Sequence, residues 1–334
     1  MTKRTNFLFL LFLPLFWYCS SSQQLSVANL EKGQWTKLKS DDGSQPVKRH
    51  EAAFVGVKDK FYLIGGRRMN PVSIYDTQTK TWTNGSVPPV ELHHFQPVVY
   101  QNDIYILGAL TGGYPGETPV EHIYIYETAT DKWKRGAAIP QNRLRGGAGT
   151  ALLDNKIYLS CGIKDGHRGD HKSWLDVYDL KTGEWTQLPD APRPRDHFQS
   201  VIADGKLYNV GGRTTIAAQN PFKHTIGEVD VFDFATKTWS TIKDLIPTQR
   251  AGNFTLLLGE EILVLGGESF AQQAAHSEVE ALNTQTHRWS QLPNLPVGRH
   301  GTGAVFFNKR IYTASGCGNR GGNPELSDLW TFSF

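Results

Sequence analysis

A repeated unit of about fifty residues constrains the fold of this chain more than any other feature of its sequence. The unit contains a short run of β-forming residues, a tight polar turn and a tryptophan, as in Val177 to Trp185. The unit tryptophans are separated by 47, 51, 52, 54 and 50 residues, and they are Trp35, Trp82, Trp133, Trp185, Trp239 and Trp289. A fixed period in this range is typical of propeller arrays. Internal repetition therefore predicts the fold.

Each unit carries a second marker, a β-rich run that ends in small residues. These runs span residues 61–66, 104–109, 157–162, 207–212, 262–267 and 311–316. An apolar or small-residue run precedes each of them, as expected for an inner strand that is buried on both faces. Two-residue polar turns such as Asp59-Lys60 join the two runs. With the strand that ends in Tyr-Asp and the strand that begins with Trp, this order predicts four strands in each of six units.

The order of features in each unit resembles the kelch repeat, and the resemblance extends from about Trp35 to Phe334. The features are, in order, an arginine, a small-residue strand, Gly-Gly, Tyr-Asp and Trp. The resemblance implies an all-β fold, a six-bladed β-propeller with four antiparallel strands per blade. The segment 328–334 supplies only a third strand for the sixth unit, and Trp35 to Leu38 supplies a fourth strand. We therefore expect the N-terminal strand to join the C-terminal blade, because a closed ring has no open sheet edge.

The N-terminal segment indicates the compartment in which the protein is expected to work. Lys3 and Arg4 precede an apolar run at residues 7–18, so residues 1–22 are predicted to be a signal peptide. Cys19 resembles a lipoprotein cysteine, although Trp17 and Tyr18 replace the usual small residues before it. Two products stay open, a secreted or periplasmic protein and an outer-membrane or cell-surface lipoprotein whose only membrane contact is a lipid at Cys19. A short linker at 23–31 and one propeller at 32–334 would follow.

Charge and cysteines exclude some function classes. The chain has 35 Lys+Arg against 32 Asp+Glu, a net charge of +3, and this balance does not favour a nucleic-acid partner. Cys161 and Cys317 belong to units three and six, on opposite sides of a six-unit ring, so no disulfide is expected between them. Galactose oxidase, a copper radical oxidase, shares the kelch repeat. Its chemistry needs a Tyr linked to a Cys beside two histidine ligands. Both cysteines lie in strand motifs, so no cofactor is predicted.

One face of the predicted propeller collects arginines and histidines. When the inner strands are aligned on their glycine pairs, one equivalent position holds Arg49, Arg145, Arg195, Arg250 and Arg299. The next two positions hold His50-Glu51, His93-His94, Gly146-Gly147, Asp196-His197, Ala251-Gly252 and His300-Gly301. Two interpretations of the arginines stay open: they bond backbone carbonyls and tie neighbouring blades together, or they line a pocket. The histidines avoid the opposite face, which favours a pocket.

Arginines with interspersed histidines favour an anion, because a guanidinium makes bidentate contacts with carboxylates. Aromatic loop residues stack on sugar rings, so an acidic mono- or oligosaccharide is the predicted ligand, with an acidic peptide as the alternative partner. The candidate ligand-binding residues are Arg49, Glu51, His93, Arg195, Asp196, Arg250, Arg299, His300, Tyr114, Glu117, His167 and Trp174.

Two function classes follow from such a pocket. The first is a sugar-acid epimerase, mutarotase or polysaccharide lyase, with His94, His197 or His50 as the base and Arg145 or Arg195 as the cation that steadies the developing charge. The architecture resembles that of the secreted N-acetylneuraminate epimerases, without a specific motif. The second is a non-catalytic glycan- or protein-binding module. Two titratable side chains within a few ångströms would favour the enzyme. A histidine-only metal site at His50, His94, His197 and His300 is a further, less favoured hypothesis.

Overall fold

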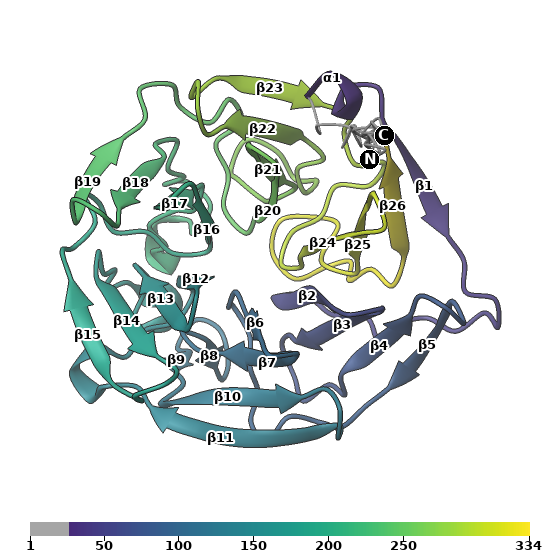
Figure 1. Cartoon of the computed structure of the whole chain (residues 1–334), viewed down its shortest axis with the longest axis horizontal. Coiled ribbons are helices and arrows are strands. Elements are labelled where there is room, and N and C mark those ends of the chain that lie inside the picture. The colour runs from purple at the N-terminus through teal and green to yellow at the C-terminus, as the bar shows by residue number, and fades with distance from the viewer. Residues whose placement is uncertain (1–26) are drawn as a thin grey trace, which may run out of the picture.

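Six four-stranded antiparallel sheets surround a central axis in the computed structural model, which describes residues 27–334 (Figure 1). Each sheet is one blade, and its first strand in the chain lies nearest the axis, except that the last blade takes its outermost strand from the N-terminal end. The prediction of an all-β, six-bladed propeller with four antiparallel strands per blade is confirmed.

The strands follow the predicted repeat. The first blade contains β2 (Ala52–Val57), β3 (Lys60–Gly65), β4 (Ser73–Asp76) and β5 (Thr81–Asn84). The second contains β6 (Val98–Tyr100), β7 (Asp103–Ile106), β10 (His122–Glu127) and β11 (Lys132–Ala138). The third contains β12 (Gly149–Leu153), β13 (Lys156–Ser160), β14 (Leu175–Asp179) and β15 (Trp185–Leu188). The fourth contains β16 (Gln199–Ala203), β17 (Lys206–Val210), β18 (Asp230–Asp233) and β19 (Thr238–Thr241).

The remaining elements complete the ring and its loops. The fifth blade contains β20 (Phe254–Leu258), β21 (Glu261–Leu265), β22 (Val279–Asn283) and β23 (Trp289–Leu292). The sixth contains β24 (Ala304–Phe307), β25 (Arg310–Ala314), β26 (Leu329–Ser333) and β1 (Gln34–Leu38). The short elements are α1 (Val27–Leu30), the hairpin of β8 (Leu110–Thr111) and β9 (Thr118–Pro119), and 3-10 turns at Gln141–Arg143, Gly166–Arg168 and Ala217–Gln219.

The strand β1 closes the ring, as the sequence predicts. It pairs antiparallel with β26 from Gln34 opposite Ser333 to Leu38 opposite Leu329. The first and last described strands, β1 and β26, therefore lie side by side in one sheet (Figure 1). Leu30, just before this strand, is buried in the hydrophobic cluster shared by the fifth and sixth blades.

The repeated tryptophans tie neighbouring blades together. The indole N–H of Trp185 donates to the carbonyl of Ala138 in the preceding blade at 3.0 Å, and Trp35 donates to Pro293 in the same way. In three blades the aspartate before the polar turn accepts backbone N–H bonds, as Asp179 does from residues 181 and 182, which is the Asx geometry of a tight turn. These motifs therefore act as scaffold on the outer part of each blade.

The structure also bears on the two cysteines of the propeller and on membrane-spanning segments. Cys161 and Cys317 are free and buried, so the part of the chain that the structure describes contains no bridge between them. No helix within residues 27–334 has the length and apolar character needed to cross a membrane. The predicted signal peptide, Cys19 and residues 23–26 of the predicted linker lie outside the described residues.

Candidate functional site

The arginines at the equivalent position do not face a cavity. Arg49, Arg145, Arg195, Arg250 and Arg299 are each completely buried. Their guanidinium groups donate to carbonyls within their own blade, as Arg145 does to Leu159 O at 2.8 Å. Four of them also pair with buried or partly buried carboxylates, including Arg145 with Asp176 at 2.7 Å.

This placement corrects two expectations from the sequence. The guanidinium groups of Arg49, Arg195, Arg250 and Arg299 hold the strands of single blades together instead of binding a ligand. Neighbouring blades are tied through the backbone carbonyls of these arginines, as in the bond from Gly162 N to Arg195 O at 2.8 Å. Arg145 is already paired, so it is not available as a catalytic cation. Trp174 also belongs to this framework, because its ring lies against the Arg143 guanidinium at 4.1 Å.

The second residue after each of these positions belongs to a ring of backbone hydrogen bonds around the axis. His94 N donates to Glu51 O, Gly147 N to His94 O, His197 N to Gly147 O, Gly252 N to His197 O, and Gly301 N to Gly252 O. The ring closes through Ala52 N to Gly301 O at 3.1 Å. All six equivalent residues have positive φ, which glycine adopts at little cost.

Three blades place non-glycine residues in this left-handed conformation. Glu51, His94 and His197 have φ of 54°, 54° and 52°, whereas the other three blades have Gly147, Gly252 and Gly301. A left-handed conformation at a non-glycine residue costs on the order of 1 kcal/mol or more and is typical of functional positions. The fold therefore strains its backbone to bring one carboxylate and two imidazoles to the axis.

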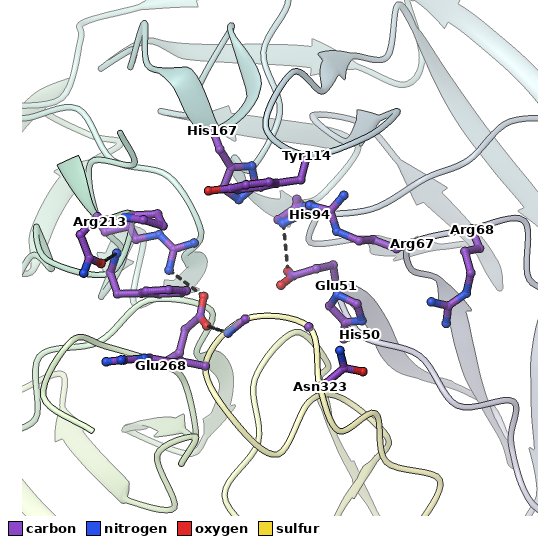
Figure 2. Close-up of a pocket in the computed structure, with 16 residues that line it drawn as sticks. His50, Glu51, Arg67, Arg68, His94, Tyr114, His167, Arg213, Glu268 and Asn323 are labelled. Carbon is purple, nitrogen blue, oxygen red and sulfur yellow. Dashed lines mark hydrogen bonds and ion pairs between the residues drawn. The ribbon is translucent and has the colours of Figure 1, made fainter. Parts of the chain in front are cut away.

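A cavity of about 730 Å³ opens above these residues (Figure 2). Its floor contains Glu51 and His94, and its walls include Tyr114 and the arginines Arg67, Arg213 and Arg320. This volume is that of a typical small-molecule site. Figure 2 shows His94 and Glu51 pointing toward one another from adjacent blades, with His167 and Tyr114 beside them.

Three buried imidazoles, which we call the histidine cluster, gather at one side of the floor: His94, His167 and His197. Their ring centroids lie 4.6 to 5.1 Å apart. Burial, followed by the neighbouring imidazoles, lowers the pKa of His94 well below its usual value. Burial and Arg213 lower the pKa of His197, against the opposing effect of Asp196. Both rings are therefore neutral near pH 7.

Hydrogen-bond partners fix which ring nitrogen carries the proton in each member of the cluster. His167 Nδ1 lies 3.0 Å from Glu117 Oε2, and His197 Nδ1 contacts Asp196 Oδ1. Carboxylates accept hydrogen bonds, so both Nδ1 atoms donate. The neutral His197 ring therefore has an unprotonated Nε2, which lies 3.2 Å from His167 Nε2.

The position of the ring proton of His94 is set by its contact with His93. Burial and Arg67 lower the pKa of His93 to about 4, so its ring is neutral. His93 Nε2 donates to the carbonyl of Gly112 at 3.1 Å, which leaves His93 Nδ1 as an acceptor. His94 Nδ1, at 2.6 Å, therefore donates to it, and His94 Nε2 is also unprotonated.

A second group on the floor combines two carboxylates with a cationic imidazole. His300 Nε2 lies 3.4 Å from Glu268 Oε2, and its Nδ1 lies 3.6 Å from Glu51 Oε1. Burial opposes the charged form of His300, but Glu268 and the other neighbours raise its pKa to about 10. Burial also opposes the charged form of Glu51, yet the neighbouring His300 imidazolium lowers its pKa to about 2. A buried imidazolium therefore lies between two carboxylates.

We expect this group to make the protein less stable at alkaline pH. The pKa of His300 is near 6.5 in an unfolded chain and about 10 in the folded one, so its stabilising effect is complete below pH 6.5 and is lost as the pH rises toward 10. Urea unfolding at pH 7 and pH 10 measures the loss, expected at roughly 2 to 4 kcal/mol. In His300→Gln this part of the pH dependence should disappear. An identical pH profile in the variant would contradict the assignment.

The remaining predicted residues lie in or near the cavity. His50 lines it and contacts Glu325 Oε1 at 2.7 Å. Glu117 is buried between His167 and Arg67, and Asp196 behind His197. The structure thus gathers His94, His167 and His197, but it separates His50 and His300 from them. The four-histidine metal set considered from the sequence is not formed.

Sequence reasoning missed several residues of the cavity. Arg67, Arg213 and Glu268 each directly follow the glycine pair of their unit. Backbone bridges join this position to the residue after the buried arginine, as between Asp196 and Arg213. Charged residues at this position in three units were the available signal. Arg320 and Phe222 lie in long loops, where no periodic pattern marks them.

Comparisons with known proteins agree with this fold. A model described as the KLHDC2/KLHL20/DRC7 Kelch-repeats domain matches residues 18–212 and 189–334. The Kelch-like protein terF of Aspergillus terreus is 29% identical over 310 residues, which cover 85% of this chain and 64% of the fungal protein. Human Kelch-like protein 23 is 26% identical over 254 residues, covering 73% of this chain and 41% of the human protein. The chain thus spans less than two thirds of these relatives.

Among solved structures, that of YjhT is similar to this chain, with a TM-score of 0.72. The likeness covers 86% of this chain and 95% of YjhT, at 15% sequence identity. At this identity the likeness concerns the fold alone.

Proposed function

The chain belongs to the Kelch-repeat family, and on that scaffold we propose that it is an enzyme that binds an acidic saccharide in its central cavity and moves a proton on it. The observation that carries the proposal is the contact between Glu51 Oε2 and His94 Nε2, 3.4 Å apart at the cavity floor. Perturbed titratable groups that meet in a cleft are typical of catalytic sites. A surface that only binds does not need them.

Glu51 and His94 form a proton-accepting pair. Glu51 is ionised near pH 7, and His94 Nε2 carries a free lone pair, so two acceptor atoms face each other without a hydrogen between them. A proton taken from a substrate would bridge these atoms and relieve their repulsion. Removal of a proton next to a carboxylate or at an anomeric hydroxyl is the step shared by epimerases, mutarotases and lyases.

The cavity wall offers cations for the acidic group of the ligand. Arg67 and Arg213 are already paired with Glu117 and Glu268. Arg320, by contrast, has no carboxylate partner among residues 27–334; its guanidinium lies over Phe222 and donates to a backbone carbonyl. We assign Arg320 as the main contact for the ligand carboxylate.

Aromatic surface completes the binding site for a sugar. Tyr114 is 55% exposed beside His167, and Phe222 lies across the cavity in a separate loop. Such rings stack on the apolar faces of pyranoses while polar groups orient the hydroxyls. We also propose that the protein works outside the cytoplasm, on the basis of the signal-like sequence at residues 1–22.

A screen of sialate, uronates and sulfated oligosaccharides by NMR tests the proposal, because it reports binding and turnover together. Glu51→Gln is expected to keep binding but lower turnover by about 100-fold or more, since general acid–base catalysis contributes that much. Arg320→Gln is expected to weaken binding at least about tenfold through loss of a charge-assisted contact. The matched control is Arg288→Gln, a surface arginine in a turn between outer strands.

Each outcome has a distinct meaning. Binding without turnover in the unmodified chain would favour the non-catalytic binding module. Failure of every acidic saccharide to bind would overturn the ligand class. Loss of binding in Arg288→Gln would show that the measured effect is not specific to the cavity.

A further inference from the structure

The histidine cluster has the form of a metal site. Its three members come from loops of three different blades, and one ring nitrogen of each lies within 4.8 Å of those of the other two. All three rings are buried, and His94 and His167 also line the cavity. We propose that His94, His167 and His197 bind a divalent first-row transition-metal ion, such as Zn²⁺, through their Nε2 atoms. The proposal stands on this geometry and does not require the saccharide.

The strongest argument is the convergence of ring nitrogens in a buried place. His167 Nε2 and His197 Nε2 lie 3.2 Å apart, and the Nδ1 atom of each ring already bonds a carboxylate. The Nε2 atoms are therefore the ring nitrogens left for a further ligand. His94 Nε2 lies on the same side of the cavity floor, 3.4 Å from Glu51 Oε2. Three imidazole nitrogens directed at one buried space form a set that a transition-metal ion can bind.

The distances also fit. Zinc binds imidazole nitrogens at about 2.0 to 2.1 Å in tetrahedral geometry, which places two ligand nitrogens about 3.3 Å apart. The His167 to His197 separation of 3.2 Å already matches that value. Small rotations of His94 would bring its Nε2 to the same ion. Imidazole ligands are suited to Zn, Cu, Fe and Ni, whereas Mg²⁺ and Ca²⁺ favour oxygen.

The groups behind the cluster are those found behind metal-binding histidines. Such histidines usually donate their second ring nitrogen to a carboxylate or another acceptor, which fixes the tautomer and orients the ring. Glu117 has this role for His167, and Asp196 has it for His197. Asp196 is in turn held by the backbone N–H of Thr215 at 2.9 Å, and Glu117 by Arg67 at 2.5 Å.

The fold holds two of the ligands in the left-handed backbone conformation at positions where three other blades have glycine. This cost is understandable if both rings must reach one point. Glu51, next to His94 on the cavity side, would face the open position of the ion. If the proposed saccharide also binds, the ion would lie at the cavity floor, within reach of a ligand oxygen, with His94 as a metal ligand and Glu51 as the group that accepts the proton.

Metal binding can be measured directly on the full chain. After removal of metal with a chelator and dialysis, titration with Zn²⁺ in a calorimeter is expected to show one ion per chain. Titration with Co²⁺ is expected to give the intense visible absorption of a tetrahedral site. His94→Gly and His197→Gly should each weaken binding by about 100-fold or more, because each removes a ligand. Both variants should fold, since glycine occupies the equivalent position in three other blades.

A positioning variant and a control sharpen the test. Glu117→Gln should weaken Zn²⁺ binding by about 10- to 100-fold without abolishing it, because it loosens only the orientation of His167. His276→Gln removes a buried histidine in the fifth blade that bonds Ser269 and should leave binding unchanged. Circular dichroism checks that each variant is folded.

The proposal fails if the stripped chain binds no stoichiometric Zn²⁺ or Co²⁺. It fails equally if folded His94→Gly and His197→Gly both bind as tightly as the unmodified chain. A chain that binds the ion but no acidic saccharide would overturn only the proposed function, and the reverse result would overturn only the metal site.

Discussion

Removal of the closing strand is expected to destabilise the whole propeller. A chain that begins at residue 39 lacks α1 and β1, so it loses the five residue pairs with β26 and the buried side chain of Leu30. It also loses the contact of the Trp35 and Phe332 rings, whose centroids lie 5.0 Å apart. Loss of one core leucine alone costs about 2 to 5 kcal/mol, and each lost hydrogen bond adds about 1 kcal/mol. The total is comparable to the stability of a typical domain.

Urea unfolding followed by tryptophan fluorescence measures this loss, which should be about 5 kcal/mol or more. The exposed edge of β26 should also increase aggregation, visible by size-exclusion chromatography. The control is a chain that begins at residue 27, which keeps both α1 and β1. Equal urea midpoints for the two chains would mean that ring closure contributes little to stability.

Arg250→Met, in the interior of the fifth blade, is expected to lower the free energy of unfolding strongly. Arg250 is completely buried; it donates to Gly266 O at 2.6 Å and Val264 O at 3.0 Å and pairs with Glu280 at 2.5 Å. The substitution leaves the Glu280 carboxylate buried without its cation. Removal of one partner of a buried ion pair costs about 3 to 5 kcal/mol, because the remaining charge is uncompensated.

A double-mutant cycle with Glu280→Gln separates this charge effect from lost packing. The double variant should be more stable than Arg250→Met alone, since it removes the unpaired charge. A matched surface pair, Arg288 with Asp244 at 3.2 Å, serves as control. Arg288→Met should cost less than about 1 kcal/mol, as exposed ion pairs contribute little. Equal effects of the buried and exposed substitutions would contradict the structural role of the buried arginines.

The backbone ring at the axis links fold stability to function. Glu51, His94 and His197 occupy strained positions that glycine fills without cost in the other three blades. Residues that strain a fold usually persist because activity needs them. The same three positions place one acid and two imidazoles near the axis, and Glu51 and His94 line the cavity. All six equivalent positions therefore join the backbone ring, and three of them also carry titratable side chains.

The sequence by itself determined the number of blades, the four strands in each and the closing strand, because these depend on periodic local signals. The small residues that end the second strand, the polar turn residue and the Trp recur at equivalent places along the chain, so each has the same role in successive units. The sequence also identified the face that contains His94, His197 and Glu51. The sequence could not show whether the arginines line the cavity, because neighbouring residues at one strand end differ only in how deeply they are buried. Arg145 is buried inside its blade, whereas Gly147, two residues later, belongs to the backbone ring at the axis.

Only the tertiary structure decided which residues form the site. His94, His167 and His197 come from three blades, and they meet because those blades converge on one axis. Glu117, Arg67 and Glu268 lie in loops whose paths depend on contacts with adjacent blades. Local patterns do not encode such contacts, because the partners are far apart in the chain. The physical reason is closure itself: residues distant in sequence become neighbours only when the six sheets complete the ring.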